Sequence, residues 1–442
     1  MNKISDSARR INTPRRDSVW RRLYIPTIVL IAFSYPITTI AFLLLGLSPT
    51  EFNASIKAVF AVMALGAWLL AFLYSRGTSN ALLPLLIFHF IYGLRLIYDV
   101  SALNIVSSFQ SPLYVYGYFF GLTVLPVIAI HIAFKRVDIE SLFRWTFAMI
   151  VVANVFLFLF SFTSDGFAAE SAFSRRTEVA GADYQTAVLN PLTFGIMGAM
   201  MSALVLGILT TTPRLTIRML GGCCLLIAIG IANILFSGSR GPFLAFAVAL
   251  SAVVWSTFGS QLRIRQITWV IVGSIVAAFI YLALFSNFEI LLFDRFLLMF
   301  ENRTGGLREE RDFLLDVAWQ DFLSSPIFGN SYVLSVGNES PHNIVMDALM
   351  STGLLGGAIL GLAMLRFALA LYKLLRGDLG RSAYCLALPS LCMLTIGMTS
   401  YSVGQSPELW IYIALVTIMG STQQTVARRG VAEFRPPDRV LV

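Results

Sequence analysis

The side chains of this sequence that could do chemistry stand in short polar stretches between long apolar runs. Arg240 lies in the hinge "FSGSRGPF", and His342 and Asn343 open the stretch "HNIVMD", whose Asp347 would share a helix face with Asn343. An arginine guanidinium grips a phosphate group through two parallel hydrogen bonds. An imidazole can act as a general base towards a hydroxyl group. These residue types therefore indicate a reaction at a phosphate-bearing substrate, with His342 as the base.

Two further stretches carry arginine pairs: Arg175 and Arg176 in the segment 163–186, and Arg308 and Arg311 in "LREERDFLLDVAWQDFLSS". Both pairs also have an interpretation without chemistry, because loop charges are commonly solvated and the second pair has acidic neighbours.

Arg240 and His342 have such an interpretation too. Arg240 could mark a helix end with its charge snorkelling to the interface, and His342 could be an ordinary residue at a helix start. Which interpretation holds depends on the helices and loops that carry these residues.

The composition is that of a membrane protein. Of the 442 residues, 57% are hydrophobic and 13% are charged, and the mean hydropathy is +0.77. No soluble domain needs so much apolar surface, and its arrangement in long runs is typical of a chain that crosses a membrane many times. The four cysteines lie within apolar runs and show neither a disulfide framework nor a metal-binding spacing.

The apolar runs predict an all-α integral membrane protein with about twelve transmembrane helices and one long outer loop. Helices are expected because the runs are continuously apolar rather than alternating. We expect a basic tail at 1–23, nine spans within 24–287, a long loop at 288–342, three spans within 343–425 and a tail at 426–442. The predicted spans are 24–47, 54–74, 81–99, 112–134, 144–162, 187–209, 216–236, 241–258, 268–287, 343–365, 382–401 and 407–425.

The distribution of positive charge orients these spans. With both tails in the cytoplasm, 22 of the 32 lysines and arginines lie inside, seven lie outside, and three lie in or at the ends of spans. This scatter over short loops, with no basic face, excludes nucleic acid as a partner despite the net charge of +8. The seven outer arginines fall in only three loops, and the five arginines named above are among them. The bias of positive charge towards the cytoplasm does not account for arginines on the outer side, so their positions need another explanation.

The long outer loop is expected to contain one helix before the next span. Apolar residues recur at helical spacing within 307–322, which predicts a helix that lies on the membrane surface or caps a cavity. Pro326 and Gly329 should break it. Pro341 should start the following helix, with His342 and Asn343 in its first turn. Within an earlier span, Arg95 should pair with Asp99.

No cluster of Asp, Glu, His or Cys at the outer face has metal-ligand spacing, so arginine rather than a cation would neutralise phosphate charge. We expect no cofactor. Arginines on one membrane face with a histidine nearby favour a lipid substrate that carries a diphosphate head group.

Three motifs resemble the O-antigen ligase and polymerase superfamily of bacterial envelope enzymes. They are "LFSGSRGPFLAF", the pattern R-x7-W-x6-P-x-x-G from Arg311 to Gly329, and "PHNIVMDALMSTGLLGG", with His342, Asn343 and Gly353 in the spacing H-N-x9-G. The resemblance covers about 230–365, and "LNPLTFG" at 189–195 is similar to an earlier segment of the family.

The resemblance implies metal-independent glycosyl transfer at the periplasmic face of the bacterial inner membrane. The donor would be an undecaprenyl-diphosphate-linked glycan, and the acceptor a glycan or the lipid A-core. By position, Arg240 and Arg311 would hold the diphosphate, and His342 would activate the acceptor hydroxyl. The family often has an aromatic residue where this chain has Leu315, so Arg308 is an alternative to Arg311.

Within the superfamily, a polymerase of O-antigen or exopolysaccharide is slightly favoured over a ligase of lipopolysaccharide biosynthesis, because no extra outer domain is present to dock a core oligosaccharide. The alternative from another class is a transporter or flippase of lipid-linked glycans. Transporters usually show two related halves and polar residues at mid-membrane depth, and neither is seen here.

Overall fold

The fold is known from a computed structural model that describes most of the chain. The described residues are 23–33, 49–74, 79–106, 111–133, 138–163, 191–212, 215–237, 239–257, 268, 271–273, 310–377 and 380–433. For 49–56, 160–163, 191, 236, 310 and 422–433 only the backbone is described. Over these ranges the secondary structure is helical and no strand is found.

The helices follow the apolar runs closely. They are α3 (Ile25–Ala32), α5 (Pro49–Tyr74), η2 (Asn80–Leu82), α6 (Leu83–Ile97), η3 (Tyr98–Ala102), α7 (Pro112–Tyr116), η4 (Gly117–Val124), α8 (Leu125–Ala133), α9 (Ile139–Thr163), α11 (Pro191–Thr211), α12 (Ile217–Phe236), α13 (Arg240–Thr257), α16 (Glu310–Ser324), α17 (Ile344–Leu375), α18 (Arg381–Ser400) and α19 (Pro407–Glu433). The segments from η2 to η3 and from α7 to α8 are continuous helical runs.

Eight described helical segments are long and apolar enough to cross a membrane, and shorter apolar helices occupy Lys57–Leu73 and Pro407–Ser421. Each predicted span except 268–287 overlaps a described helix, and nearly all of 268–287 lies outside the described residues. The all-α membrane class is therefore confirmed, while the number twelve stays a prediction.

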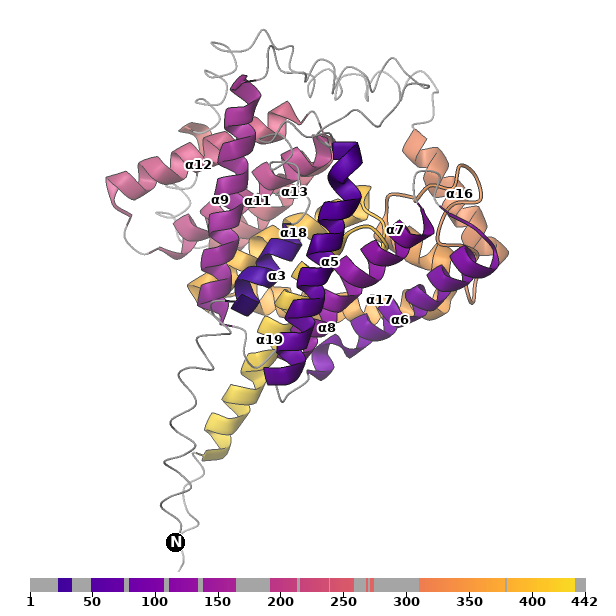
Figure 1. Cartoon of the computed structure of the whole chain (residues 1–442). Helices are drawn as coiled ribbons and strands as arrows, with labels where there is room; N and C mark the ends of the chain where they lie inside the picture. Colours follow the sequence, from indigo (N-terminus) through magenta and orange to yellow (C-terminus); the bar gives the residue numbers. More distant parts are fainter. Residues whose placement is uncertain are drawn as a thin grey trace, which may run out of the picture.

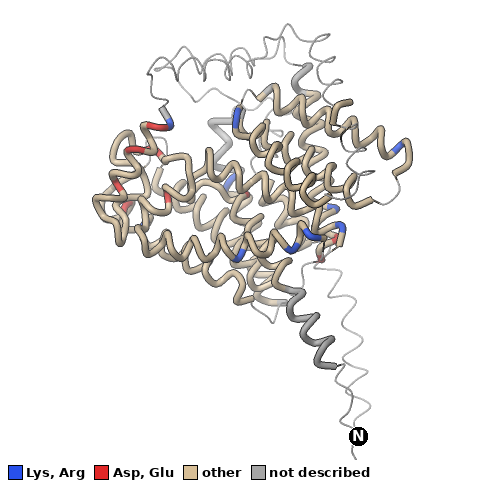
Figure 2. Tube along the Cα trace, turned by 180° about the vertical axis from the view of Figure 1, so that it is seen from behind, with Lys and Arg blue, Asp and Glu red and all other residues tan. Residues whose placement is uncertain are grey.

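The outer surface of the bundle fits a lipid environment. Large apolar side chains such as Val62, Phe90 and Leu365 are more than half exposed. Figure 2 shows charged residues widely spaced along the helices, with the acidic ones gathered mainly around α16 and the loop after it. Apolar side chains on helices of this length gain by facing hydrocarbon rather than water.

Helix α11 is the centre of one half of the bundle, where it packs against α9, α12, α13 and α18 (Figure 1). A buried polar network fixes this packing, because the Asn233 side chain donates to Asn154 Oδ1 at 2.8 Å and Asn154 donates to the Met197 carbonyl at 2.8 Å. Buried amides that satisfy one another hold helices in one register.

Helix α17 is the centre of the other half and contacts α6, α16, α18 and α19 (Figure 1). It is interrupted at Gly353, whose φ of 62° and ψ of −162° are not helical. The loop after α16 lies against this break. The Leu354 amide donates to the Pro326 carbonyl at 2.8 Å, and the Asn330 amide donates to the Met350 carbonyl at 2.7 Å. Backbone groups released by the interruption are thus satisfied by the loop.

The helix predicted in the long loop is confirmed as α16, and Pro326 and Gly329 follow its end. Its apolar face caps α17: Ala318 is buried with Leu334 and Met350 in a small core cluster. The predicted start of the next helix was wrong. Helix α17 begins at Ile344 with Asn343 as its N-cap, so Pro341 and His342 precede it. The helix also continues to Leu375, beyond the predicted end of that span.

Candidate active site

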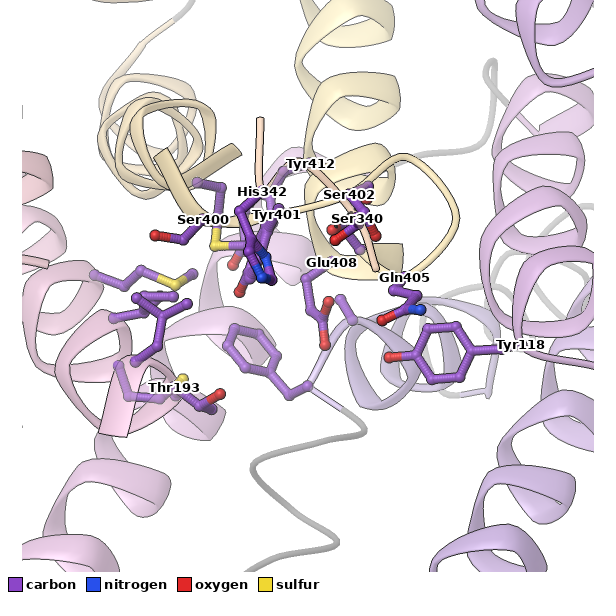
Figure 3. Close-up of a pocket in the computed structure, with 18 of the residues that line it drawn as sticks. Tyr118, Thr193, Ser340, His342, Ser400, Tyr401, Ser402, Gln405, Glu408 and Tyr412 are labelled. Atoms are coloured by element: carbon purple, nitrogen blue, oxygen red, sulfur yellow. Dashed lines mark hydrogen bonds between the residues drawn. The ribbon is translucent and has the colours of Figure 1, made fainter. Parts of the chain in front are cut away.

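A cavity with a volume of about 290 Å³ lies where several helix ends meet. Figure 3 shows its polar lining, with Thr193 on one side, Tyr118 and Gln405 on the other, and His342 and Glu408 between them. Most of its polar residues come from segments that the charge distribution assigns to the outer ends of spans. The lining residues are Ala32, Phe33, Lys57, Tyr114, Tyr118, Leu192, Thr193, Ile196, Met197, Met200, Ser340, His342, Met393, Ser400, Tyr401, Ser402, Gln405, Ser406, Glu408 and Tyr412.

His342 reaches the cavity because of an unusual backbone conformation. Its φ is 52°, in the left-handed region that few residues other than glycine adopt. A residue in this conformation cannot continue a right-handed helix. The chain therefore turns at His342 before α17 begins, and the accessible imidazole lines the cavity (Figure 3).

Asn343 and Asp347, predicted as accessory site residues, tie this turn to the α18–α19 loop. Asn343 Oδ1 accepts from the Val345 and Met346 amides at 3.0 Å each, and its Nδ2 donates to the Met398 carbonyl at 2.8 Å. Asp347 is buried, and its Oδ2 accepts from the Val403 amide at 2.7 Å. Both side chains are used to position His342 and the cavity wall, and neither lines the cavity.

Arg311, in the first turn of α16, reaches the rim of the cavity. Its Nη1 donates to the Thr399 carbonyl at 3.2 Å, and Thr399 immediately precedes Ser400, which lines the cavity. The contact joins residues 88 positions apart in the sequence. Arg311 is exposed.

Arg240 is the first residue of α13, and α13 begins close to Thr399. A Cβ atom added at Gly241 would lie 3.5 Å from Thr399 Oγ1 and 3.6 Å from Leu192 Cδ1, and Leu192 lines the cavity. The hinge before it is held by Ser237, whose Oγ accepts from the Ser239 amide at 3.2 Å and donates to the Ile234 carbonyl at 2.7 Å. Arg240 is half-buried and does not line the cavity itself.

Three other predicted residues cannot be placed. Arg175, Arg176 and Arg308 lie outside the described residues. Among the residues that are described, no group of three or more His, Cys, Asp or Glu side chains is arranged to hold a metal ion.

The predicted pair of Arg95 and Asp99 is confirmed at 2.9 Å. It also anchors the loop after α16, because Asp99 Oδ2 accepts from the Tyr332 amide at 2.8 Å and Arg95 donates to the Gly329 carbonyl at 3.3 Å. The pair therefore positions the outer segment and does not line the cavity.

Sequence reasoning missed the opposite wall of the cavity, where Lys57, Tyr114, Tyr118, Gln405 and Glu408 gather. Two of these five residues could have been recognised as candidates from the sequence. Lys57 and Glu408 are ionisable residues at the ends of predicted spans, and ionisable residues at such depths usually have a functional role. The other three are ordinary residue types whose proximity only the fold reveals.

A comparison with protein families matches residues 223–361 to the family described as O-antigen ligase. The predicted family resemblance is confirmed over this segment. The matched residues hold the Arg240 hinge, α16 and the start of α17, and they support glycan assembly of the O-antigen ligase and polymerase type, with lipid-linked glycans as the general substrate class. A search of curated proteins found no match.

Proposed function

We propose that this multi-pass membrane protein is a metal-independent glycosyltransferase of the bacterial inner membrane, active at the periplasmic face and with both termini in the cytoplasm. It transfers a glycan from an undecaprenyl-diphosphate carrier to an acceptor glycan or to the lipid A-core. Support comes chiefly from one observation. His342 lines the cavity, Arg311 donates to the Thr399 carbonyl next to the lining residue Ser400, and a Cβ atom at Gly241, the residue after Arg240, would lie 3.5 Å from Thr399 Oγ1.

In the proposed reaction an acceptor hydroxyl oxygen attacks the anomeric carbon of the donor sugar. The bond between this carbon and the phosphate oxygen breaks, and its electron pair leaves with the diphosphate. The hydroxyl proton passes to the imidazole of His342. Arg240 and Arg311 bind the diphosphate and stabilise its growing negative charge, with Arg308, Arg175 and Arg176 as further candidates from the same outer loops.

The apolar part of the cavity suits a lipid-linked donor. Phe33, Leu192, Ile196 and Met197 continue the cavity from its polar mouth into the bundle. A carrier lipid with a charged head group needs both environments next to one another. Between the two activities of the superfamily, we favour polymerisation.

Reconstitution with lipid-linked repeat units, with and without a core-lipid acceptor, tests the function. Long polymer on the carrier lipid identifies a polymerase, and transfer of label only to core lipid identifies a ligase. In a deletion strain, Arg240→Ala and His342→Ala should abolish surface glycan while the amount of protein in the membrane stays unchanged. A wild-type glycan ladder from either variant removes that residue from the site.

A further inference from the structure

One wall of the cavity has no role in the reaction as proposed above. It is formed by Lys57 of α5, Tyr114 of α7, Tyr118 of η4, Gln405 of the α18–α19 loop and Glu408 of α19. We refer to these five residues as the polar wall. Its residues come from three separate parts of the chain, so its polarity is a product of the fold.

Lys57 is held in a fixed position by two tyrosines. Its Nζ donates a hydrogen bond to the Tyr114 hydroxyl and lies 4.6 Å and 4.7 Å from the centroids of the Tyr114 and Tyr118 rings. The two rings are stacked with centroids 5.7 Å apart. Such cation–π contacts orient an ammonium group.

Glu408 presents its carboxylate to the cavity from the first turn of α19 (Figure 3). Its carboxylate makes no hydrogen bond to another side chain among the residues that the structure describes. Glu408 and Lys57 attract one another electrostatically, yet they form no close ion pair of the kind seen between Arg95 and Asp99. A carboxylate oxygen that lines a cavity can accept hydrogen bonds from a ligand.

The two sides of the cavity carry different charged residues. Arg311 donates to the Thr399 carbonyl, next to Ser400, whereas Glu408 lies towards Tyr118 and Gln405 (Figure 3). Because the Lys57 ammonium and the Glu408 carboxyl group share this wall, it lacks the excess of positive charge that would favour the donor diphosphate there. Its lining offers one positive charge, one negative charge, an amide and hydroxyls, which together match an uncharged ligand rich in hydroxyl groups.

A much smaller cavity, with a volume of about 20 Å³, lies beside the polar wall. It shares Tyr118, Ser340, Ser402 and Gln405 with the main cavity and is also lined by Tyr332 and Val333 of the loop after α16.

We propose that the polar wall is the subsite for a neutral acceptor saccharide, in which Glu408 accepts hydrogen bonds from sugar hydroxyls while Lys57 and Gln405 donate to them. The proposal rests on the function proposed above and assigns the two substrates to opposite sides of His342. The donor diphosphate lies on the Thr399 side, and the acceptor hydroxyl is presented from the Glu408 side.

Two binding probes test this assignment on the full-length protein in lipid nanodiscs. One is the repeat-unit oligosaccharide released from the surface glycan and freed of phosphate, and the other is inorganic pyrophosphate. Glu408→Gln should weaken binding of the oligosaccharide about tenfold, because a neutral amide oxygen replaces the charged acceptor, and should not weaken binding of pyrophosphate. Glu140→Gln is the matched control, because Glu140 bonds Arg144 and Ser382 away from the cavity.

Unchanged oligosaccharide binding by Glu408→Gln, or a loss of its pyrophosphate binding, would overturn the subsite. If that variant does not fold, Gln405→Ala, at an exposed loop position, takes its place with the same expectations. Kinetics separate this proposal from the function. If wild-type protein transfers glycan and Glu408→Gln has an unchanged KM for acceptor, the subsite is wrong while the function stands. If wild-type protein transfers nothing but binds the oligosaccharide through Glu408, the function is wrong while the subsite stands.

Discussion

Gly353, where α17 is interrupted, packs directly against the backbone of Ile327 in the loop after α16. A Cβ atom at Gly353 would overlap the Ile327 carbonyl group, and its φ of 62° is one that other residues rarely adopt. The contact is reciprocal, because a Cβ atom at Gly329 would overlap the backbone of Ser351. Gly329 and Gly353, which belong to two separate sequence motifs, therefore form one close backbone contact, referred to below as the joint. It holds the loop that leads to His342.

We expect Gly353→Ala to destabilise the protein by more than about 2 kcal/mol, since it adds both a steric overlap and a strained backbone. The measurement is the thermal unfolding midpoint in detergent. Gly361→Ala, in the same helix, is the control, because a Cβ atom there meets nothing within 4 Å and alanine favours helix. Equal midpoints for the two variants would contradict this account of the joint.

Asn343→Ala should lower stability by about 1 kcal/mol through loss of the N-cap and should reduce glycan transfer by releasing the turn at His342. Asn343→Asp separates these effects. Aspartate still caps α17, but it cannot donate to the Met398 carbonyl. Near-normal stability with reduced transfer in Asn343→Asp would assign the Met398 contact to positioning. Full transfer in Asn343→Ala would show that the turn does not need this anchor.

Sequence reasoning predicted the helices well because apolar runs of this length have few alternatives to a membrane span. It also predicted α16 and the Arg95–Asp99 pair, both of which follow from spacing along one helix. It failed at the start of α17, where Pro341 looked like a first helical residue but His342 adopts a left-handed conformation. That turn is set by tertiary bonds from Asn343 and Asp347 to the distant α18–α19 region, which no local pattern encodes.

Of the proposed site residues, His342 lines the cavity, and Arg240 and Arg311 do not. Sequence reasoning singled out these three because polar residues of these types at the predicted outer ends of apolar runs are conspicuous, and their role stays a prediction. The polar wall was missed because Tyr118 and Gln405 are ordinary in sequence and become neighbours only when η4 and the start of α19 line one cavity.

Arg311→Lys should distinguish a phosphate ligand from a structural contact. Lysine can still donate to the Thr399 carbonyl, but it cannot form two parallel hydrogen bonds to a phosphate. We expect Arg311→Lys to retain the thermal midpoint and to lose roughly 10²-fold in transfer rate, with Arg311→Ala losing more. Arg376→Ala, which removes a guanidinium stacked on Tyr372, should leave transfer unchanged. Wild-type rates in Arg311→Lys would leave Arg308 as the candidate loop arginine.

The side of the membrane on which the cavity opens can be tested by labelling cysteines. Gln405 is exposed in the α18–α19 loop at the cavity, and Arg376 follows the far end of α17. If the cavity opens to the periplasm, Gln405→Cys reacts with a membrane-impermeant maleimide in intact spheroplasts, and Arg376→Cys reacts only after the membrane is permeabilised. Of the four native cysteines, only Cys224 is not buried, so Cys224→Ser provides the background. The reverse labelling pattern would place His342 in the cytoplasm, where the proposed transfer at the periplasmic face could not occur.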